Sequence, residues 1–230
     1  MVAPLWSWTG FYIGVNAGYG FNSGDVSTTG QTGINIATVA DGARPGSVSL
    51  DRDGFIGGAQ IGYNWQSGLW VFGIEADIQY TDFEDSVNVV TTGTAFPGVR
   101  NNIFNQELEY LGTVRGRIGY AWDRTLFYGT GGFAYGGVKN NAQFFGPQPA
   151  NVSQFIGGSD KTETGYTVGG GFEHAFSPNW TFKVEYLYYD LGDTTVAVNF
   201  IPGGGGVGTG YNSTFENDGH IVRAGLNYKW

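Results

Sequence analysis

Hydrophobic and polar residues alternate along several segments of the chain, and the last segment shows the pattern most clearly. Between His220 and Trp230 almost every second residue is apolar or aromatic, and the residues between them include Arg223, Asn227 and Lys229. Successive side chains of a β-strand point to opposite faces, so this segment has one apolar face and one polar face. Helical periodicity is absent throughout, and glycines interrupt every segment. The pattern predicts an all-β protein.

The spacing of these segments predicts how the strands are connected. Eight strands are expected, near residues 8–22, 53–66, 69–83, 106–122, 126–138, 164–176, 180–192 and 217–230. Tight turns are expected at 66–68, 123–125 and 177–179, and long loops rich in Gly, Ser, Thr, Asn and Asp at 23–52, 84–105, 139–163 and 193–216. Short turns at one end and long loops at the other are typical of outer-membrane barrels. We therefore predict one domain over residues 1–230, an eight-stranded antiparallel up-and-down transmembrane β-barrel with long extracellular loops and short periplasmic turns.

The two faces of the predicted strands differ in charge. Away from the strand ends, no Asp, Glu, Lys or Arg falls on the apolar face of any strand, whereas the opposite face holds acids and bases in nearly equal numbers. Charges enclosed in a barrel are costly unless they are paired, so this balance predicts a lumen filled by ion pairs. The faces of 126–138 stay open, because aromatic residues and glycines occupy both. The predicted lumenal network comprises Glu75, Asp77, Glu107, Glu109, Arg115, Arg117, Glu173, Lys183, Glu185, Arg223 and Lys229.

Tryptophans gather near the short turns and the chain ends, where an aromatic girdle is expected at the membrane interface. The alternative is a soluble β-sandwich with these rings in its core. That alternative is disfavoured because the reverse faces carry the ion-pair candidates. The predicted girdle comprises Trp8, Trp65, Trp70, Trp122, Trp180 and Trp230.

Composition limits the chemistry further. The 230 residues include 41 glycines and no cysteine, and only 13% are charged. Without cysteine, a disulfide framework, a thiolate metal site and a thiol nucleophile are excluded. The net charge of −9 argues against nucleic-acid binding, and the pattern assigns most of it to the predicted loops. The opening residues, 1–6, lack the features of a signal peptide, so an exported protein is expected to have lost its signal already.

We predict no catalytic residue, cofactor or metal site. His174 and His220 lack a nearby partner for catalysis, and both are expected at the membrane interfaces. The acidic stretches 51–53 and 82–85 lack the spacing of a calcium loop, so solvated acids are favoured over a Ca²⁺ or Mg²⁺ site. The glycine runs at 129–132 and 169–171 are followed by no phosphate-binding lysine motif and are expected to give space to lumenal side chains.

Four runs of sequence, at 8–20, 111–120, 184–192 and 220–230, together resemble the small porin-like outer-membrane β-barrel proteins of alphaproteobacteria. The fold of that family is similar to the OmpA transmembrane domain. The resemblance implies an eight-stranded barrel in the outer membrane of a Gram-negative bacterium. It also implies a C-terminal aromatic signal for the barrel-assembly machinery, here Tyr228 and Trp230.

Three functional hypotheses remain open at this point. The first is a structural or surface-interaction role, with a charged lumen and acidic external loops. The second is a narrow, low-conductance porin, since Arg115 and Arg117 could form a gate among the lumenal acids. The third, implied only by the resemblance, is capture of a ligand such as haemin by the loops. The expected partners are outer-membrane lipid, lipopolysaccharide and the assembly machinery, with a possible homo-oligomer or lattice.

Overall fold

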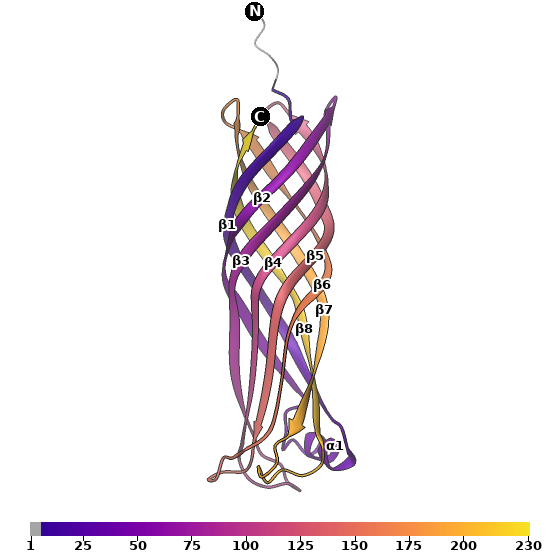
Figure 1. Ribbon diagram of the computed structural model, residues 1–230, viewed down its shortest axis with the longest axis vertical. Helices are drawn as coiled ribbons and strands as arrows, with labels where there is room; N and C mark the ends of the chain where they lie inside the picture. The colour runs from indigo at the N-terminus through magenta and orange to yellow at the C-terminus, as the bar shows by residue number, and fades with distance from the viewer. Residues whose placement is uncertain (1–5) are drawn as a thin grey trace, which may run out of the picture.

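The computed structural model describes residues 6–230, so the opening residues 1–5 lie outside the described part of the chain. Eight strands close into one antiparallel barrel in chain order (Figure 1). They are β1 (Gly10–Gly30), β2 (Ser47–Ser67), β3 (Trp70–Thr91), β4 (Arg100–Trp122), β5 (Thr125–Phe145), β6 (Ser153–Ala175), β7 (Trp180–Phe200) and β8 (Gly210–Lys229). The helix α1 (Gly33–Ala40) lies between β1 and β2. None of the helices in 6–230 is long and apolar enough to cross a membrane.

The strands are much longer than the sequence predicts. Each has 20 to 23 residues. A tilted strand needs only about 9–11 residues to span a bilayer, so each strand extends well past it. Most of the residues predicted as long loops are therefore strand, and the connections at that end shrink to 31–46, 92–99, 146–152 and 201–209. At the other end, 68–69 and 123–124 form two-residue turns, in which Gly68 and Asp123 adopt positive φ. The prediction of eight strands and short turns is confirmed, and the predicted lengths of the loops are wrong.

Two regions of the barrel wall differ in the character of their outer surface. The membrane half comprises 10–21, 55–67, 70–80, 110–122, 125–135, 166–175, 180–188 and 220–229. Its outer face is apolar, with Ile13, Ile74 and Ile118 exposed. The outer half comprises 22–30, 47–54, 81–91, 100–109, 136–145, 153–165, 189–200 and 210–219. Its exposed acids are Asp25, Asp51, Asp53, Asp82, Glu84, Asp160, Asp193 and Glu216.

The interior of the outer half is a hydrophobic core. One wall, from β7, β8, β1 and β2, contributes Val26, Leu50, Val198 and Phe215, among others. The facing wall, from β4 to β6, contributes Phe104, Ala142, Phe144 and Phe155. The two walls separate where neighbouring strands stop pairing. Between β2 and β3 the pairing ends at Asp53↔Glu84, on the side toward the loops, and between β6 and β7 it is interrupted over 157–165. Figure 1 shows the strands running obliquely near the chain termini and nearly along the long axis toward α1. The outer half therefore resembles two facing sheets with apolar side chains between them.

Two bulges reverse the direction of side chains near the junction of the halves. On β4 the register shifts between Leu108 and Tyr110, and on β7 it shifts between Asp190 and Asp193. A bulge adds one residue to a strand. On β4, for example, even-numbered residues face the lumen up to Leu108, and odd-numbered residues face it from Leu111 onward. A second apolar cluster fills the lumen at this level, and it includes Ile56, Leu111, Leu187 and Ile221.

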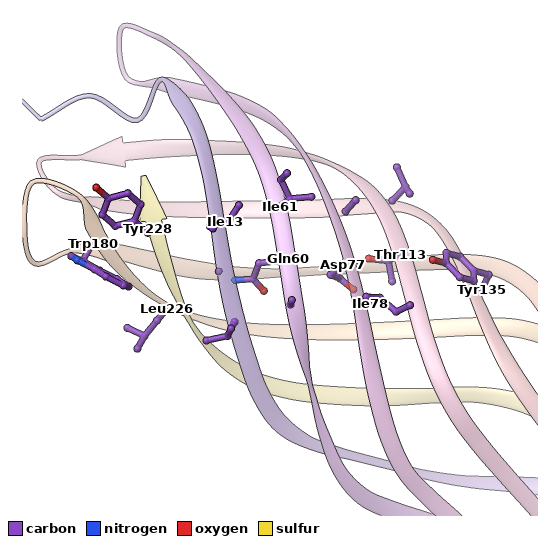
Figure 2. A pocket seen from close by; sticks show the side chains of 15 residues that line it. Ile13, Gln60, Ile61, Asp77, Ile78, Thr113, Tyr135, Trp180, Leu226 and Tyr228 are labelled. Carbon is purple, nitrogen blue, oxygen red and sulfur yellow. Dashed lines mark hydrogen bonds between the residues drawn. The ribbon is translucent and has the colours of Figure 1, made fainter. Parts of the chain in front are cut away.

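The faces of β5, left open by the sequence, are resolved by the structure. Phe127 and Phe133 are exposed on the outer wall, whereas Leu126 and Tyr128 are buried in the lumen. Outside, a groove of about 890 Å³ crosses the lipid-facing wall where Ala59 and Ala76 lie among larger side chains such as Ile61 (Figure 2). This groove opens on the hydrocarbon layer and not on the lumen.

Candidate functional site: the charged lumen

Four acids and four bases meet inside the membrane half, and the strand register brings them together. Glu75 on β3 pairs directly with Arg115 on β4, and Glu185 on β7 pairs with Arg223 on β8. Directly opposite residues of neighbouring strands have Cβ atoms about 5 Å apart, which suits an ion pair. The charged cluster therefore follows from β-sheet geometry and needs no loop to position it.

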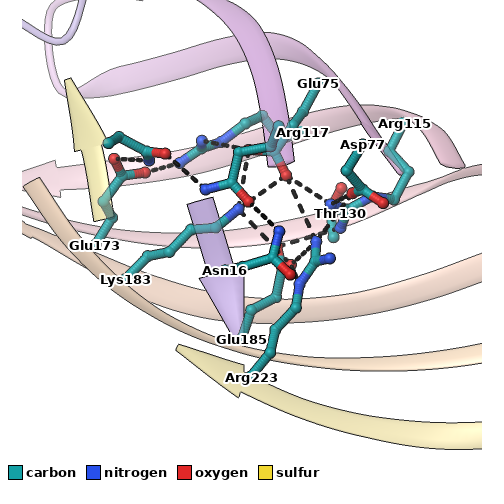
Figure 3. A network of polar contacts seen from close by, with 12 residues as sticks. Asn16, Glu75, Asp77, Arg115, Arg117, Thr130, Glu173, Lys183, Glu185 and Arg223 are labelled. Atoms are coloured by element: carbon teal, nitrogen blue, oxygen red, sulfur yellow. Dashed lines mark hydrogen bonds and ion pairs between the residues drawn. The ribbon is translucent and has the colours of Figure 1, made fainter. Parts of the chain in front are cut away.

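Arg115 contacts three of the four carboxylates of the cluster, and Figure 3 shows it beside Asp77. Its Nη2 lies 2.5 Å from Glu75 Oε1 and 2.7 Å from Asp77 Oδ2, and its Nη1 lies 3.2 Å from Glu185 Oε1. Its Nε donates to the Thr113 hydroxyl at 2.9 Å. The guanidinium thus contacts three carboxylates and one hydroxyl, and these contacts fix its position.

Arg223 and Lys183 complete the pairing of the same acids. Arg223 Nη2 lies 2.5 Å from Glu185 Oε2 and 3.0 Å from Asp77 Oδ2. Lys183 Nζ donates to both oxygens of Glu75, at 2.9 and 3.0 Å. Every carboxylate among these residues therefore touches at least two cations.

Arg117 extends the cluster toward the periplasmic end. Its Nη2 lies 2.8 Å from Glu173 Oε2, and its guanidinium carbon lies 4.1 Å from the ring centre of Tyr128. The Tyr12 hydroxyl donates to Glu75 Oε2 at 2.8 Å, and the Tyr128 hydroxyl donates to Glu185 Oε1 at 2.9 Å. These bonds occupy remaining acceptor positions of the carboxylates, as a buried ionic network requires.

The lumenal network, as observed, comprises Glu75, Asp77, Glu173, Glu185, Arg115, Arg117, Lys183 and Arg223. Its formal charges cancel, and all eight residues are buried. The arrangement links β3, β4, β6, β7 and β8 across the barrel axis. Chemically it can neutralise and cross-link the interior, and its guanidinium and ammonium groups are already occupied by carboxylates.

Glu107 and Glu109, predicted to be lumenal, lie outside the network. The bulge at Leu108–Tyr110 turns Leu108 into the lumen and both acids onto the outer wall, where their side chains are 45% and 39% exposed. Both form ion pairs with Lys139. Their predicted place was wrong because of the bulge. Apolar and polar residues alternate on both sides of it, but the residues that face the lumen change from odd-numbered to even-numbered positions.

Lys229 and Trp8 also depart from their predicted places. Lys229 lies at the periplasmic mouth, with its Nζ 5.3 Å from the ring centre of Trp6 and not among the lumenal acids. Trp8 is not part of an exposed girdle, since it is only 1% exposed and packs inside the mouth against Val71 and Leu126. Its backbone N–H donates to Gln66 Oε1 at 2.8 Å. The segment that precedes β1 therefore closes the periplasmic end.

The other five tryptophans are exposed on the outer wall at the periplasmic end, and these are Trp65, Trp70, Trp122, Trp180 and Trp230. Tyr228, the other residue of the predicted assembly signal, packs edge-on against Trp180 and Trp230. A second ring of outward-facing aromatic residues at the junction with the outer half escaped the sequence prediction. It comprises Tyr19, Phe55, Tyr80 and Tyr166. On β2 and β3 an aromatic residue lies ten positions from a tryptophan, Phe55 from Trp65 and Tyr80 from Trp70, and this spacing could have indicated the ring.

The two histidines and the acidic stretches lie on the wall of the barrel. His174 Nδ1 is 2.9 Å from the Thr125 hydroxyl, and His220 stacks on Phe21 and Tyr186. No group of three or more His, Asp or Glu side chains in residues 6–230 is placed to hold a metal ion. The structure brings neither histidine near the lumenal network.

The comparisons with known proteins identify the family. The family model for the outer membrane protein beta-barrel domain matches residues 2–229. The chain therefore belongs to this family. It is an outer-membrane protein, and the resemblance inferred from the four sequence runs is confirmed.

Named relatives come from alphaproteobacteria. The "31 kDa outer-membrane immunogenic protein" of Brucella melitensis biotype 1 is 38% identical over 99% of this chain and 87% of the relative. The "22 kDa outer membrane protein" of Rhizobium leguminosarum bv. viciae is 34% identical over 82% of this chain and 67% of the relative. Among solved structures, the outer membrane protein OprG of Pseudomonas aeruginosa has a TM-score of 0.54 at 15% identity, with 98% of both chains covered. That last likeness concerns the fold alone.

Proposed function

We propose that this barrel is a closed, rigid scaffold that presents the outer half and its four loops to the exterior of the cell. The observation that carries the proposal is the filling of the lumen along its whole length. Trp8 and its neighbours close the periplasmic mouth, the lumenal network follows, and two apolar clusters fill the junction and the outer half. A barrel of about eight strands leaves little room for water once such side chains occupy it.

The charges support a role in surface contact. The four observed loops contain one acid, Asp41, and one base, Arg44, so the negative charge lies on the strands of the outer half and not on the loops. The immunogenic name of the Brucella relative is consistent with a surface that is reached from outside the cell. Both histidines lie on strands, so histidine ligation of haemin by the loops gains no support.

Single-channel recording tests the proposal against the narrow porin. Purified protein refolded into planar bilayers should give no steady unitary steps, with folding verified by heat-modifiable migration on gels. Steady steps would support the porin. In that case Arg115→Ala, which removes the central cation of the lumenal network, should change the ion selectivity of the steps.

We also propose that Tyr228 and Trp230 form the signal for the barrel-assembly machinery, and that lipid and lipopolysaccharide surround the wall. The five exposed tryptophans would then form the periplasmic girdle. Replacing both terminal aromatics by alanine should slow assembly in cells while leaving the unfolding midpoint of the refolded protein nearly unchanged. If the protein forms a homo-oligomer or a lattice, chemical cross-linking of intact membranes should give products larger than the single chain.

A further inference from the structure

Arg44 enters the outer mouth of the barrel from the loop that follows α1. Its side chain is almost fully buried, with 3% exposure. Its Nη1 donates to Asn102 Oδ1 at 2.8 Å, and its Nη2 donates to Gln154 Oε1 at 2.9 Å. No ion pair within residues 6–230 includes Arg44.

Three aromatic rings surround the guanidinium. Its carbon lies 5.4, 5.8 and 5.9 Å from the ring centres of Phe144, Phe155 and Tyr211. A cation within about 6 Å of a ring centre is attracted by the ring electrons, most strongly where water is excluded. The rings also pack edge-on against one another, since Tyr211 lies 5.1 Å from Phe144 and 5.0 Å from Phe155. The rings therefore keep their positions independently of Arg44.

One of the two amide oxygens, that of Asn102, is also held in place by other bonds. Asn102 Nδ2 donates to the Val89 carbonyl at 3.0 Å and to the Thr91 hydroxyl at 2.9 Å, so its Oδ1 faces the guanidinium. The guanidinium cage is defined here as Asn102, Phe144, Gln154, Phe155 and Tyr211. Its members come from β4, β5, β6 and β8, none from the loop that carries Arg44.

Simple filling of space does not explain this arrangement. Burying a charge without a carboxylate is unfavourable, and a leucine or methionine could cover the same rings without that cost. Burial accordingly lowers the pKa of Arg44 from its ordinary value. The cage offers what a guanidinium needs, namely flat ring faces and two acceptor oxygens.

We propose that the guanidinium cage is a binding site that Arg44 occupies from within the chain, and that an arginine side chain of an extracellular peptide can take its place. The loop segment around Arg44 is short and flanked by Gly42, at a φ of +79°, and Gly46. Its withdrawal would leave all five cage residues in their strands. The acidic wall of the outer half would attract a cationic peptide toward the mouth.

The first test empties the site and offers a small probe. The variant Arg44→Ala, refolded in detergent micelles, should bind ethylguanidinium at least about tenfold more tightly than the native protein, whose site is occupied. The double variant Arg44→Ala/Phe155→Leu keeps an apolar wall but loses one ring, and should bind about fivefold or more weakly, because a desolvated cation–π contact is worth about 1–2 kcal/mol. N-ethylurea, which has a similar shape and no charge, should not bind. Equal weak binding in all three proteins overturns the proposal.

The second test uses the native protein. The Arg44 amide donates to the Thr38 carbonyl at 3.1 Å, so its hydrogen exchange reports whether the segment leaves the mouth. A peptide acetyl-Gly-Arg-Gly-amide should accelerate that exchange, and the same peptide with neutral citrulline should not. If the variant binds ethylguanidinium but the native amide is unaffected by saturating arginine peptide, Arg44 is a permanent seal and the exchangeable site is refuted. Neither result bears on the conductance test of the closed lumen.

Discussion

In the membrane half, Ile74 faces outward while Glu185 and Arg223 are buried inside, whereas in the outer half Glu216 faces outward while Phe215 is buried inside. The first arrangement is that of a membrane protein, and the second is that of a water-soluble one. Both occur on the same strands. The comparison teaches that the surrounding medium, and not the face of a strand, determines which residues are enclosed.

Strand β2 shows the change along one face. Its lumenal positions hold Gln60 and Asn64 in the membrane half, and Leu50 and Val48 in the outer half. A strand of 21 residues is about 70 Å long at 3.3 Å per residue, so it extends well past the hydrocarbon layer. Once the outer wall meets water, apolar side chains gain free energy by turning inward.

The largest effect is expected inside the lumenal network. Glu185→Gln leaves three acids facing four bases, so one cation loses its compensating charge in a buried site. The free energy of unfolding should fall by about 3–5 kcal/mol, measured by urea unfolding from lipid vesicles. Glu216→Gln, on the exposed wall of the outer half, is the matched control and should change it by less than about 0.5 kcal/mol. Similar losses in both variants would contradict the distinction between the halves.

A comparable loss is expected in the core of the outer half. Phe104 is fully buried there between Phe144 and Phe215, so Phe104→Ala leaves a cavity and should cost about 3–5 kcal/mol. Phe72 faces lipid in the membrane half, where acyl chains fill the vacated space. Phe72→Ala should therefore lose only the free energy of transferring the phenyl ring from water to the hydrocarbon layer, about 1.5–3 kcal/mol. If Phe104→Ala is the milder change, the outer half lacks a packed core.

One strand offers a matched pair for the outer surfaces. Ile74 and Val90 both lie on β3 with outward side chains, 67% and 61% exposed. Ile74→Arg places a charge in the hydrocarbon layer and should cost about 2–4 kcal/mol, measured by folding yield and unfolding from vesicles. Val90→Arg lies in water and should stay within about 0.5 kcal/mol. Equal severity would show that the two residues face the same medium.

Sequence alternation was sufficient to predict the membrane half and most of its network. Glu75, Asp77 and Arg115 alternate without interruption, so parity alone places them in the lumen. Parity failed at Glu107 and Glu109 because the bulge that precedes Tyr110 depends on pairing with two neighbouring strands. It also failed at Trp8, which lies before β1 and follows no strand periodicity.

The outer half was missed for a different reason. Its strands are rich in Ser, Asn, Asp and Gly, a composition that favours loops in soluble proteins. Residues 47–51, Ser-Val-Ser-Leu-Asp, nevertheless alternate as a half-buried strand does. The structure shows that this segment is part of β2 and that its apolar residues, Val48 and Leu50, face the core. What the sequence alone could not supply is the facing wall of β4 to β6 against which these residues pack.

The smallest effect concerns like charges on the outer wall. Glu84 on β3 lies directly opposite Asp53 on β2 and Glu107 on β4, and like charges in that position repel. Glu84→Lys turns two repulsive pairs into attractive ones and should raise the free energy of unfolding by up to about 1 kcal/mol at low salt. Asn88→Lys, exposed on the same strand and opposite Ile103, adds one positive charge, half of the two-unit change that Glu84→Lys makes, and shows how much of the gain comes from net charge alone. Because salt screens exposed charges, the gain from Glu84→Lys should shrink as sodium chloride rises toward 1 M, and a gain independent of salt would point to packing instead of charge.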